Sequence, residues 1–455
     1  MTVAVVGAGI TGLSAAYFLE RLSPTPERIL LIEKAKTVGG LIETFRWENF
    51  LLEKGPEALI SYKKSGIQLC KDLGLEPSLF ESNPENNRTF MVKNGKLFPL
   101  PYGILSPLRQ PKLRLAATFA FTPLLSLKAK IRMALELLVP PKDTPGDESI
   151  RHFVSRRMGK DFFETLVEPL LSGVYGKNPG DLSAGMVLKE LVSAEERYGG
   201  ITKALLHSKA LTGPRKSIFV SLKEGLGQLT RRLAESLTST KIFLNCEVTA
   251  IQKNGQGWHL MGSDGLNENV DAIVMACPAF AASRLIQPFD EVLAGHLGGI
   301  EYSSATIFTY AFNREDVGHA LNGYGFLIPP EENIPIHACT WTSSKWDHRA
   351  PPGKVIIRAY APMLVTDEAT QQIILNYLRS LLSIKNGPLF EEVYPLPYSM
   401  PFYRVGHSER LLKIKKNLSN HPGLFLAGAA YEGVGISDCI DSARRASEET
   451  QKYLH

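Results

Sequence analysis

The sequence has few cysteines, and they form no recognisable pattern. Five cysteines occur in 455 residues, and no two of them form a Cys-x-x-Cys pair. Because their number is odd and they lie far apart, neither a disulfide framework nor a zinc knuckle is indicated, and a reducing compartment is favoured. We also predict no metal site, since strand alternation explains the spacing of His337 and Cys339 and no second ligand pair follows.

The chain also lacks a strong excess of charge. The 51 lysines and arginines against 46 aspartates and glutamates give a formal net charge of +5 at pH 7. This falls short of the basic stripe of nucleic-acid-binding proteins, so we expect no nucleic-acid partner. Hydrophobic residues make up 44% and charged residues 21%, which argues against a disordered or fibrous chain. At roughly 150 residues per domain, the length predicts two or three domains.

No uncharged run in the middle of the chain is long enough to cross a bilayer. The longest notable run, 115–127, contains Pro123 and is shorter than the roughly 20 apolar residues needed. Its cationic flanks suit a surface lying in an anionic headgroup layer; they are Lys112, Arg114, Lys128, Lys130 and Arg132. An ordinary buried helix with charged ends explains the same pattern, and the sequence leaves both interpretations open.

The N-terminus runs directly into a strand pattern, without the features of a signal or transit peptide. We therefore expect a cytoplasmic protein. If the cationic flanks do contact lipid, it would attach peripherally to the inner face of the cell membrane.

A glycine-rich turn follows the first predicted strand, 2–6, and precedes a helical stretch and a second strand that ends at Glu33. The turn reads Gly7-Ala8-Gly9-Ile10-Thr11-Gly12. In such a turn the first glycine allows the tight bend, the second lets the backbone approach a pyrophosphate, and the third lets helix and strand pack closely. With Glu33 placed to accept ribose hydroxyls, the pattern predicts a dinucleotide-binding βαβ unit.

Further segments identify the dinucleotide. They are Lys34 with Gly39-Gly40-Leu41, then Gly55-Pro56, and, near the C-terminus, Gly428 and Gly435-Ile436-Ser437. These residues resemble the FAD-binding pattern of the amine oxidase and protoporphyrinogen oxidase superfamily. The resemblance implies FAD as the cofactor, with the Gly-Gly segment along the pyrophosphate and the C-terminal segment closing over the flavin. It also implies that Val248 contacts the adenine through its backbone. The helix that follows Gly435 would aim its N-terminus at the flavin and stabilise the negative charge of the reduced form.

The cofactor segments are separated along the chain. We predict an α/β fold with an FAD-binding, Rossmann-like domain assembled from three discontinuous segments, 1–89, 216–285 and 405–455. Helical periodicity predicts a helical insert over 90–215, which would line the substrate cavity and is the candidate membrane-associating segment. The β-rich runs within 286–404 predict a mixed α+β substrate domain.

Motifs outside the cofactor segments narrow the resemblance. The stretch 87–101, the loop 323–329 and the string Glu-Pro-Leu-Leu-Ser-Gly-Val-Tyr at 168–175 are similar to the protoporphyrinogen oxidase family. The resemblance implies oxidation of a porphyrinogen to a porphyrin in haem biosynthesis, by three hydride transfers. O2 would reoxidise FAD to give hydrogen peroxide, and the product would be handed to a chelatase. Protoporphyrinogen IX is the expected substrate, and coproporphyrinogen III is the alternative.

The resemblance implies three substrate-binding residues, and Gly325 is a fourth candidate because it lies beside one of them, Leu327. Arg88 matches the propionate-binding arginine of the family, and its guanidinium fork suits a carboxylate. Leu327 and Trp341 match residues that pack on the macrocycle, and Gly325 would let a backbone carbonyl face the pyrrole N–H groups. We predict no catalytic base, because hydride loss from an electron-rich ring mainly requires the ring to be held against the flavin and water to be excluded.

Three other classes remain as alternatives. A flavin amine oxidase shares the cofactor segments but usually carries an aromatic residue where this chain has 433–436. A carotenoid-type desaturase would need a long apolar tunnel. A flavoprotein used only as a binding or redox-sensing module would hold a flavin that no candidate substrate reduces. The sequence leaves the oligomeric state open.

Overall fold

The computed structural model describes residues 1–455 except 105–106, 110, 144–145, 177, 208–216 and 256. The chain forms two compact units. Unit 1 comprises Met1–Glu81, Ser217–Glu301 and His407–His455, and unit 2 comprises Ser82–Lys216 and Tyr302–Gly406. The boundary predicted between 215 and 216 lies outside the described residues.

Unit 1 is organised around a parallel five-stranded sheet with the order β10-β2-β1-β14-β20. Parallel sheets are covered on both faces, which explains why these strands read as nearly continuous apolar runs. The strands come from all three stretches of unit 1: β1 (Thr2–Val6), β2 (Arg28–Ile32), β10 (Thr240–Phe243), β14 (Ala272–Met275) and β20 (Leu424–Leu426).

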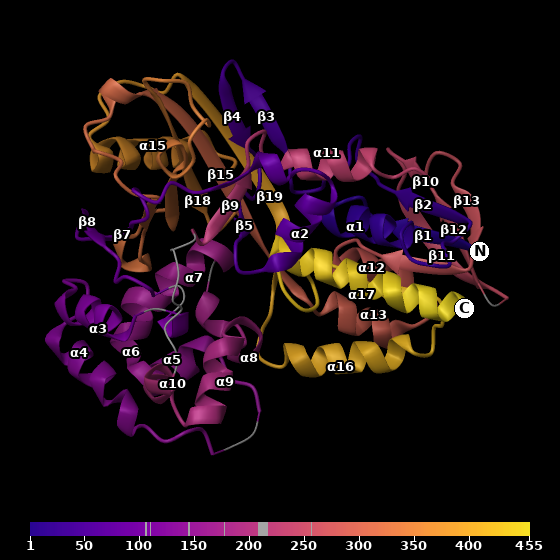
Figure 1. The fold of residues 1–455 in the computed structure, drawn as a ribbon, viewed down its shortest axis with the longest axis horizontal. Coiled ribbons are helices and arrows are strands. Elements are labelled where there is room, and N and C mark those ends of the chain that lie inside the picture. The colour runs from indigo at the N-terminus through magenta and orange to yellow at the C-terminus, as the bar shows by residue number, and fades with distance from the viewer. Residues whose placement is uncertain (105–106, 110, 144–145, 177, 208–216, 256) are drawn as a thin grey trace. The chain divides into compact units, whose positions relative to one another are not determined.

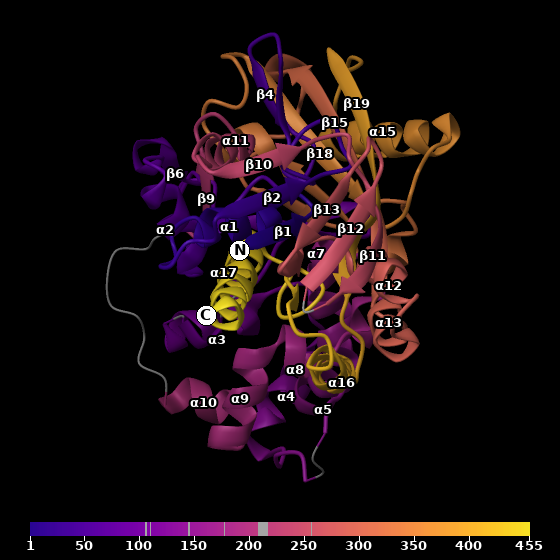
Figure 2. The same ribbon diagram turned by 90° about the vertical axis from the view of Figure 1, so that its right-hand side faces the viewer.

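Two helices from opposite ends of the chain cover one face of this sheet. Figures 1 and 2 show α1 (Ile10–Leu19) and α17 (Ile436–Leu454) side by side. They approach closely because small residues face each other in the core, Ala15 and Ala16 on α1 and Ala443 and Ala446 on α17. The Ser447 hydroxyl donates to the Ala15 carbonyl at 3.1 Å. The C-terminal helix is thereby joined to the first helix of the chain.

The remaining elements of unit 1 surround this core. They are α2 (Lys64–Asp72), α11 (Gly227–Glu235), α12 (Ala279–Ile286), α13 (Glu291–Gly298), α16 (His407–Leu418), the hairpin β3 (Thr44–Trp47) and β4 (Phe50–Glu53), the small sheet of β5 (Leu59–Ile60), β9 (Phe219–Leu222) and β6 (Leu79–Glu81), and the meander β11 (Val248–Asn254), β12 (Gly257–Gly262) and β13 (Asn267–Val270).

Unit 2 contains a seven-stranded sheet with the order β19-β15-β18-β17-β16-β7-β8. Helix α15 (Glu368–Leu382) covers one face, because Ile374, Leu378 and Leu382 recur at helical spacing and join the sheet residues in one core. The strands are β7 (Thr89–Lys93), β8 (Lys96–Pro99), β15 (Glu301–Asn313), β16 (Gly325–Leu327), β17 (Ala338–Trp341), β18 (Lys354–Ala361) and β19 (Phe390–Phe402).

The helical part of unit 2 lies between β8 and β15 in the sequence. Its elements are α3 (Lys112–Phe121), α4 (Leu127–Ala134), the 3-10 turn η3 (Leu135–Leu138), α5 (Ile150–Met158), α6 (Lys160–Phe162), the π-helical turn η4 (Phe163–Val167), α7 (Glu168–Tyr175), α8 (Ala184–Val187), α9 (Lys189–Tyr198) and α10 (Ile201–His207); a short α14 (Thr342–Lys345) follows β17. Among the described helices, none is both long enough and apolar enough to cross a membrane.

The division into units differs from the predicted domains in three respects. Residues 82–89 and 405–406, predicted in the FAD-binding segments 1–89 and 405–455, belong to unit 2. The segments 90–215 and 286–404 were predicted as separate domains, but β7 pairs in parallel with β16, so strands from both segments share one sheet. Residues 286–301 belong to unit 1 instead of the β-rich segment, because α13 packs on α12. Sequence periodicity identifies elements but does not show which strands pair.

A buried ion pair holds the helical part of unit 2 together. Arg157 on α5 and Glu136 in η3 form a salt bridge, and both side chains are fully buried. The Glu136 carboxylate also accepts N–H groups of Ile201 at 3.0 Å and Thr202 at 2.8 Å. Burial acts to raise the pKa of Glu136, but hydrogen bonds from Thr202, Arg157 and Ile201 outweigh it and lower the pKa below its ordinary value. Three helical elements therefore meet at one charge pair.

Removal of one partner should destabilise unit 2 strongly. Arg157→Met leaves the Glu136 carboxylate buried without its cation, and we expect a loss of about 3–5 kcal/mol in the free energy of unfolding, measured with urea. The matched control is Arg445→Met, which breaks an ion pair with Glu432 whose side chains are 49% and 59% exposed. This control should cost less than about 1 kcal/mol. An equal loss of unfolding free energy in the two variants would contradict a stabilising role of the buried pair Arg157–Glu136.

Candidate functional site

The turn between β1 and α1 is shaped by glycine. Gly7 has φ +101°, and its N–H donates to the Ile32 carbonyl at 2.7 Å. A Cβ on Gly12 would lie 1.7 Å from the Gly7 carbonyl oxygen, so the fold itself requires glycine there. A Cβ on Gly9, in contrast, would meet no protein atom within 4 Å. Space is therefore left at Gly9 for something other than the chain.

The N-terminus of α1 is open to an anion. Its N-cap is Gly9, no side chain caps it, and its first turn holds no acidic residue. The first N–H groups of a helix lack intrahelical partners and attract negative charge. Of the other predicted residues of this turn, Ala8 and Thr11 are buried and Ile10 is partly buried against the core.

The segment at Gly39 and Gly40 lies directly against this turn. Gly39 forms a β-bridge with Gly9, and its N–H donates to the Ala8 carbonyl at 2.8 Å. A Cβ on Gly40 would lie 3.2 Å from the Gly9 Cα atom. Two segments predicted separately from the sequence therefore form one continuous surface.

Gly55 extends this surface. A Cβ there would lie 2.0 Å from the Leu41 carbonyl oxygen, so the two backbones are in contact. Leu41 is 48% exposed, and Lys34 and Pro56 are exposed as well. These side chains are accessible to a ligand.

Glu33 at the end of β2 joins the glycine turn to the neighbouring strands. Its carboxylate accepts the N–H groups of Ala8 at 2.7 Å and Ala35 at 2.8 Å. A carboxylate offers about four acceptor positions, so capacity remains for ribose hydroxyls. The Cys246 N–H donates to the Glu33 carbonyl at 2.9 Å, which places the chain just before Val248 beside Glu33. Val248 itself is 8% exposed and begins β11.

The C-terminal segment reaches the first turn of α1. Gly428 has φ +128°, and its N–H donates to the Ser442 hydroxyl at 3.0 Å. A Cβ on Gly428 would lie 3.7 Å from the Thr11 hydroxyl. Gly435 is the N-cap of α17, and its N–H donates to the Asp438 carboxylate at 3.0 Å. Of the other predicted residues, Ile436 packs on the core and Ser437 is 3% exposed.

The residues of unit 1 fit a flavin dinucleotide. A pyrophosphate requires open space and N–H groups, which are present at Gly9 and at the uncapped N-terminus of α1, where two glycine segments are in backbone contact. A ribose requires a hydrogen-bond acceptor, and the Glu33 carboxylate has capacity left. Sequence reasoning missed two residues here, Lys63 and Ser442. Each becomes visible only when the first turns of α17 meet other segments.

The predicted propionate anchor belongs to unit 2. The Arg88 side chain is exposed and makes no ion pair with a residue that the structure describes. Its carbonyl accepts the Tyr324 N–H at 2.7 Å, which fixes Arg88 beside the start of β16. The guanidinium is therefore available to an anion.

Gly325 and Leu327 lie on β16. Gly325 has φ +139°, and a Cβ there would lie 1.9 Å from the Cys339 carbonyl oxygen. Glycine is therefore needed to bring β16 against β17, whatever the ligand. Leu327 is 8% exposed, and a Cβ on Gly173 would lie 3.2 Å from its Cδ2 atom. Helix α7, which carries the string 168–175, thus packs over Leu327.

Trp341 is not brought together with these residues. Side chains alternate across a strand, so Trp341 points to the face of the sheet opposite to Ala338, the partner of Leu327 in β16. The Trp341 side chain is fully buried among aromatic rings. Its ring centroid lies 5.6 Å from that of Phe90 and 4.7 Å from that of His319. Its position supports packing in the core, instead of the predicted contact with the substrate.

The face that holds Leu327 also carries polar residues that the sequence did not single out. Arg358 on β18 is 1% exposed and pairs in register with Thr309 on β15 and Thr340 on β17. Strand alternation places all three on the face of Ala338. Their convergence could not be predicted, since it depends on the pairing of three strands.

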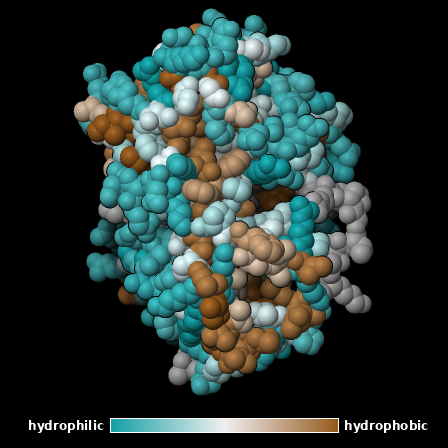
Figure 3. Space-filling model, turned by 90° about the vertical axis from the view of Figure 1, so that its left-hand side faces the viewer, coloured by the Kyte–Doolittle hydropathy of each residue, from teal (hydrophilic) through white to brown (hydrophobic). Residues whose placement is uncertain are grey.

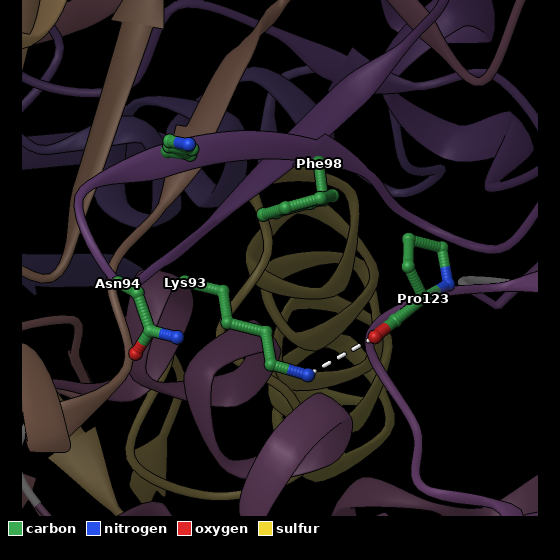
Figure 4. A pocket seen from close by; sticks show the side chains of 5 residues that line it. Lys93, Asn94, Phe98 and Pro123 are labelled. Carbon is green, nitrogen blue, oxygen red and sulfur yellow. Dashed lines mark hydrogen bonds between the residues drawn. The ribbon is translucent and has the colours of Figure 1, made fainter.

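A hollow of about 370 Å³ lies elsewhere in unit 2 (Figure 4). Lys93 crosses it and donates to the carbonyls of Pro123 at 3.0 Å and Leu124 at 3.1 Å. This contact ties the β7–β8 hairpin to the loop between α3 and α4. None of the predicted site residues lines it. In the described part of the chain, no group of three or more His, Cys, Asp or Glu side chains is arranged to hold a metal ion.

Gly9→Ala provides a direct test of the cofactor position. Because the added methyl meets no protein atom, the apoprotein should fold normally, whereas bound FAD should lose close backbone contact and bind at least about tenfold more weakly. The measurement is FAD affinity by fluorescence titration, with urea unfolding of the apoprotein alongside. The control Gly295→Ala, on α13, also meets no protein atom and should leave FAD affinity unchanged. Unaltered affinity in Gly9→Ala would place the pyrophosphate elsewhere.

Comparison with known proteins gives consistent results. A family described as flavin containing amine oxidoreductase matches residues 10–450. Coproporphyrinogen III oxidase of Bacillus subtilis (strain 168) is 31% identical over 99% of this chain and 98% of its own length. Protoporphyrinogen oxidase 1, chloroplastic, of Spinacia oleracea is 28% identical over 99% of this chain and 84% of its own length.

A solved structure agrees in fold over the whole chain. The crystal structure of a protein from Exiguobacterium sp. 255-15 superimposes with a TM-score of 0.86 at 29% identity, and the match covers 100% of this chain and 98% of the other. The family match begins within the glycine turn, at residue 10, and extends through the C-terminal segment. The chain therefore belongs to the flavin-containing amine oxidoreductase family and is an FAD-dependent oxidoreductase.

Proposed function

We propose that this enzyme oxidises a porphyrinogen to a porphyrin, removing six electrons in three hydride transfers, with O2 as the final acceptor and hydrogen peroxide as the by-product. The observation that carries the proposal is the contact of α7 with Leu327, since it joins the substrate-side motif at 168–175 to the residue expected to pack on the ring. Both relatives described above are oxidases of a porphyrinogen by name and cover 99% of the chain.

The reaction requires the protein to position the porphyrinogen ring more than to transfer a proton. FAD supplies the hydride acceptor. Arg88 presents a free guanidinium to a propionate and would fix one edge of the ring. Leu327, enclosed by α7, offers an apolar surface to the macrocycle and excludes water from it. No side chain needs to act as a strong base.

Two substrates share this chemistry. Protoporphyrinogen IX, with two propionates, is the substrate predicted from the sequence. Coproporphyrinogen III, with four, is favoured by the relative from Bacillus subtilis, which matches nearly full length on both sides. The two differ in the number of carboxylates that the protein must neutralise, which is a difference in binding and not in redox chemistry.

The proposal is tested by mixing the yellow holoenzyme, in air, with each porphyrinogen and recording porphyrin fluorescence against a no-enzyme control. Faster appearance with one substrate identifies it. Fluorescence at the control rate with both, together with hydrogen peroxide release from simple amines, would replace this proposal with the amine oxidase alternative.

Arg88→Met should raise the KM for the preferred porphyrinogen about 10- to 100-fold with little change in kcat. This range corresponds to the loss of one charge-assisted hydrogen bond, about 1.5–3 kcal/mol. Arg231→Met, which removes an exposed arginine on α11 in unit 1, is the matched control. If KM is the same in the wild type and in both variants, the propionate anchor lies elsewhere.

The surface of α3, α4 and η3 is unusually apolar. Figure 3 shows apolar residues gathered in the lower half of the face drawn there. On α3, only Leu115 and Phe119 are buried. The large apolar side chains exposed on these elements are Leu113 (85%), Phe121 (86%), Leu127 (75%), Ile131 (55%), Leu135 (47%), Leu137 (40%) and Leu138 (75%). A set of this kind marks an interaction surface.

We propose that this surface contacts a membrane that contains anionic lipid. Arg114 and Lys128 are exposed beside the apolar residues, which suits negative headgroups. Lys112 and Arg132 are engaged within the protein and contribute less, since Lys112 donates to the Leu206 carbonyl at 2.6 Å and Arg132 donates to the carbonyls of Arg156 and Arg157. Helices that place apolar side chains in the acyl boundary and cations among headgroups lie flat on a bilayer.

Vesicle sedimentation tests the membrane contact. The wild type should co-sediment with vesicles that contain phosphatidylglycerol and much less with neutral vesicles. Phe121→Glu should reduce sedimentation at least about fivefold, because it places a charge in the apolar layer. Leu412→Glu, at a leucine on α16 that is 69% exposed, is the control and should sediment like the wild type. Equal sedimentation of both variants would contradict the assignment of this surface.

A further inference from the structure

The first turn of α17 contains an acid with a dedicated cation. Asp438 accepts two hydrogen bonds from the Lys63 ammonium, at 2.6 Å and 2.8 Å. The same carboxylate accepts the Gly435 N–H at 3.0 Å. The Asp438 and Lys63 side chains are 21% and 39% exposed, so water screens the pair only in part. Lys63 lies immediately before α2, and both residues belong to unit 1.

The pair is part of a seam that fixes the start of α17 to the start of α2. The Ser437 hydroxyl donates to the Lys63 carbonyl at 3.3 Å and accepts the Gly66 N–H at 3.2 Å. One turn further along, Ser65 hydrogen-bonds to Asp441. The Ser437 hydrogen bond fixes the backbone of Lys63, and the two hydrogen bonds to Asp438 place its ammonium at the start of α17.

The backbone at Gly433 and Gly435, just before α17, lies close to the Asp438 carboxylate. A Cβ on Gly433 would lie 2.5 Å from the Asp438 Cγ atom, and Gly433 has φ +154°. A Cβ on Gly435 would lie 3.0 Å from an Asp438 carboxylate oxygen and 3.7 Å from the Lys63 Nζ atom. The loop that the family resemblance places over the flavin thus passes within contact distance of both charges.

Asp438 presents an electrostatic problem at this position. A helix N-terminus stabilises negative charge, and reduced flavin carries such charge. An aspartate in the first turn caps the helix but opposes that effect, because like charges repel. The Lys63 ammonium cancels the carboxylate charge while leaving the cap in place. The positive end of α17 is then preserved for the cofactor.

We propose that Lys63 is a positioning residue of the flavin site that neutralises Asp438 and thereby raises the reduction potential of bound FAD. The inference rests on the proposed placement of the α17 N-terminus at the flavin, and it is independent of which porphyrinogen is oxidised. Lys63 acts through Asp438 and the helix end, without a role in hydride transfer.

The test is the midpoint potential of bound FAD in purified holoenzymes, measured by equilibration with a reference dye. Lys63→Met leaves a net negative charge and should shift the potential to more negative values, by about 30 mV for a tenfold weaker preference for reduced over oxidised flavin. Asp438→Asn keeps a cap but leaves a net positive charge, so the potential should shift in the opposite direction. The double variant should return close to the wild type.

Two controls separate charge from structure. Lys63→Arg keeps the cation and should keep the wild-type potential. Lys452→Met removes an exposed charge in the last turn of α17, about 24 Å along the helix at 1.5 Å per residue, and should also leave the potential unchanged. FAD content per protein chain is measured for every variant, so that a loss of fold is recognised.

The outcomes are distinct. If Lys63 only holds the seam together, both single variants release the same contact, shift the potential in the same direction and resemble the double variant; that result overturns the proposal. Unchanged potentials in all variants with full FAD content also overturn it, by placing the α17 N-terminus away from the flavin. Neither result affects the assignment of the reaction, which is assayed on the unaltered enzyme.

Discussion

Backbone contact at glycine, closer than any side chain allows, is the constraint on which the cofactor unit depends. The Gly7 carbonyl occupies the space of a Gly12 side chain, and Gly40 lies against the Cα atom of Gly9. These contacts bring the second glycine segment onto the first turn and leave Gly9 facing open space. The C-terminal segment joins them through Gly428 beside Thr11. The proposed pyrophosphate site is therefore formed by three parts of the chain without a charged side chain at its centre, because helix N–H groups would supply the attraction.

The two units carry different parts of the proposed reaction. Unit 1 carries the residues proposed to hold the cofactor. Unit 2 carries Arg88, which makes no ion pair with a described residue, and an apolar wall under α7. Porphyrinogen oxidation fits this division, since the ring needs orientation and dryness more than an acid or base. The charges at the flavin end serve the redox step instead: Asp438 caps α17 and Lys63 offsets it. The Asp438 carboxylate thus takes part both in capping α17 and in setting the reduction potential of the flavin.

Local patterns predicted the candidate cofactor residues, whereas strand pairing decided what the sequence could not show. The spacing of Gly7, Gly9 and Gly12 specifies a turn whose geometry is local, and the structure brings Gly39 and Gly40 onto it. Trp341 matched a family residue by its position in the sequence. Because side chains alternate across β17, it lies in the core on the face of the sheet opposite to Leu327. Arg358 gave no sequence signal because its neighbours belong to other strands. Lys63 and Asp438 meet across a sequence separation of 375 residues, which no periodicity reveals.

The central claim is that flavin bound to this chain takes electrons from a porphyrinogen. Anaerobic titration of the holoenzyme with a porphyrinogen, followed by the bleaching of flavin absorbance, tests it most directly. Because six electrons leave each ring in pairs, the account predicts that one mole of porphyrinogen bleaches three moles of bound FAD and releases one mole of fluorescent porphyrin. Flavin that stays oxidised with both porphyrinogens, but is bleached by a simple amine, would contradict it.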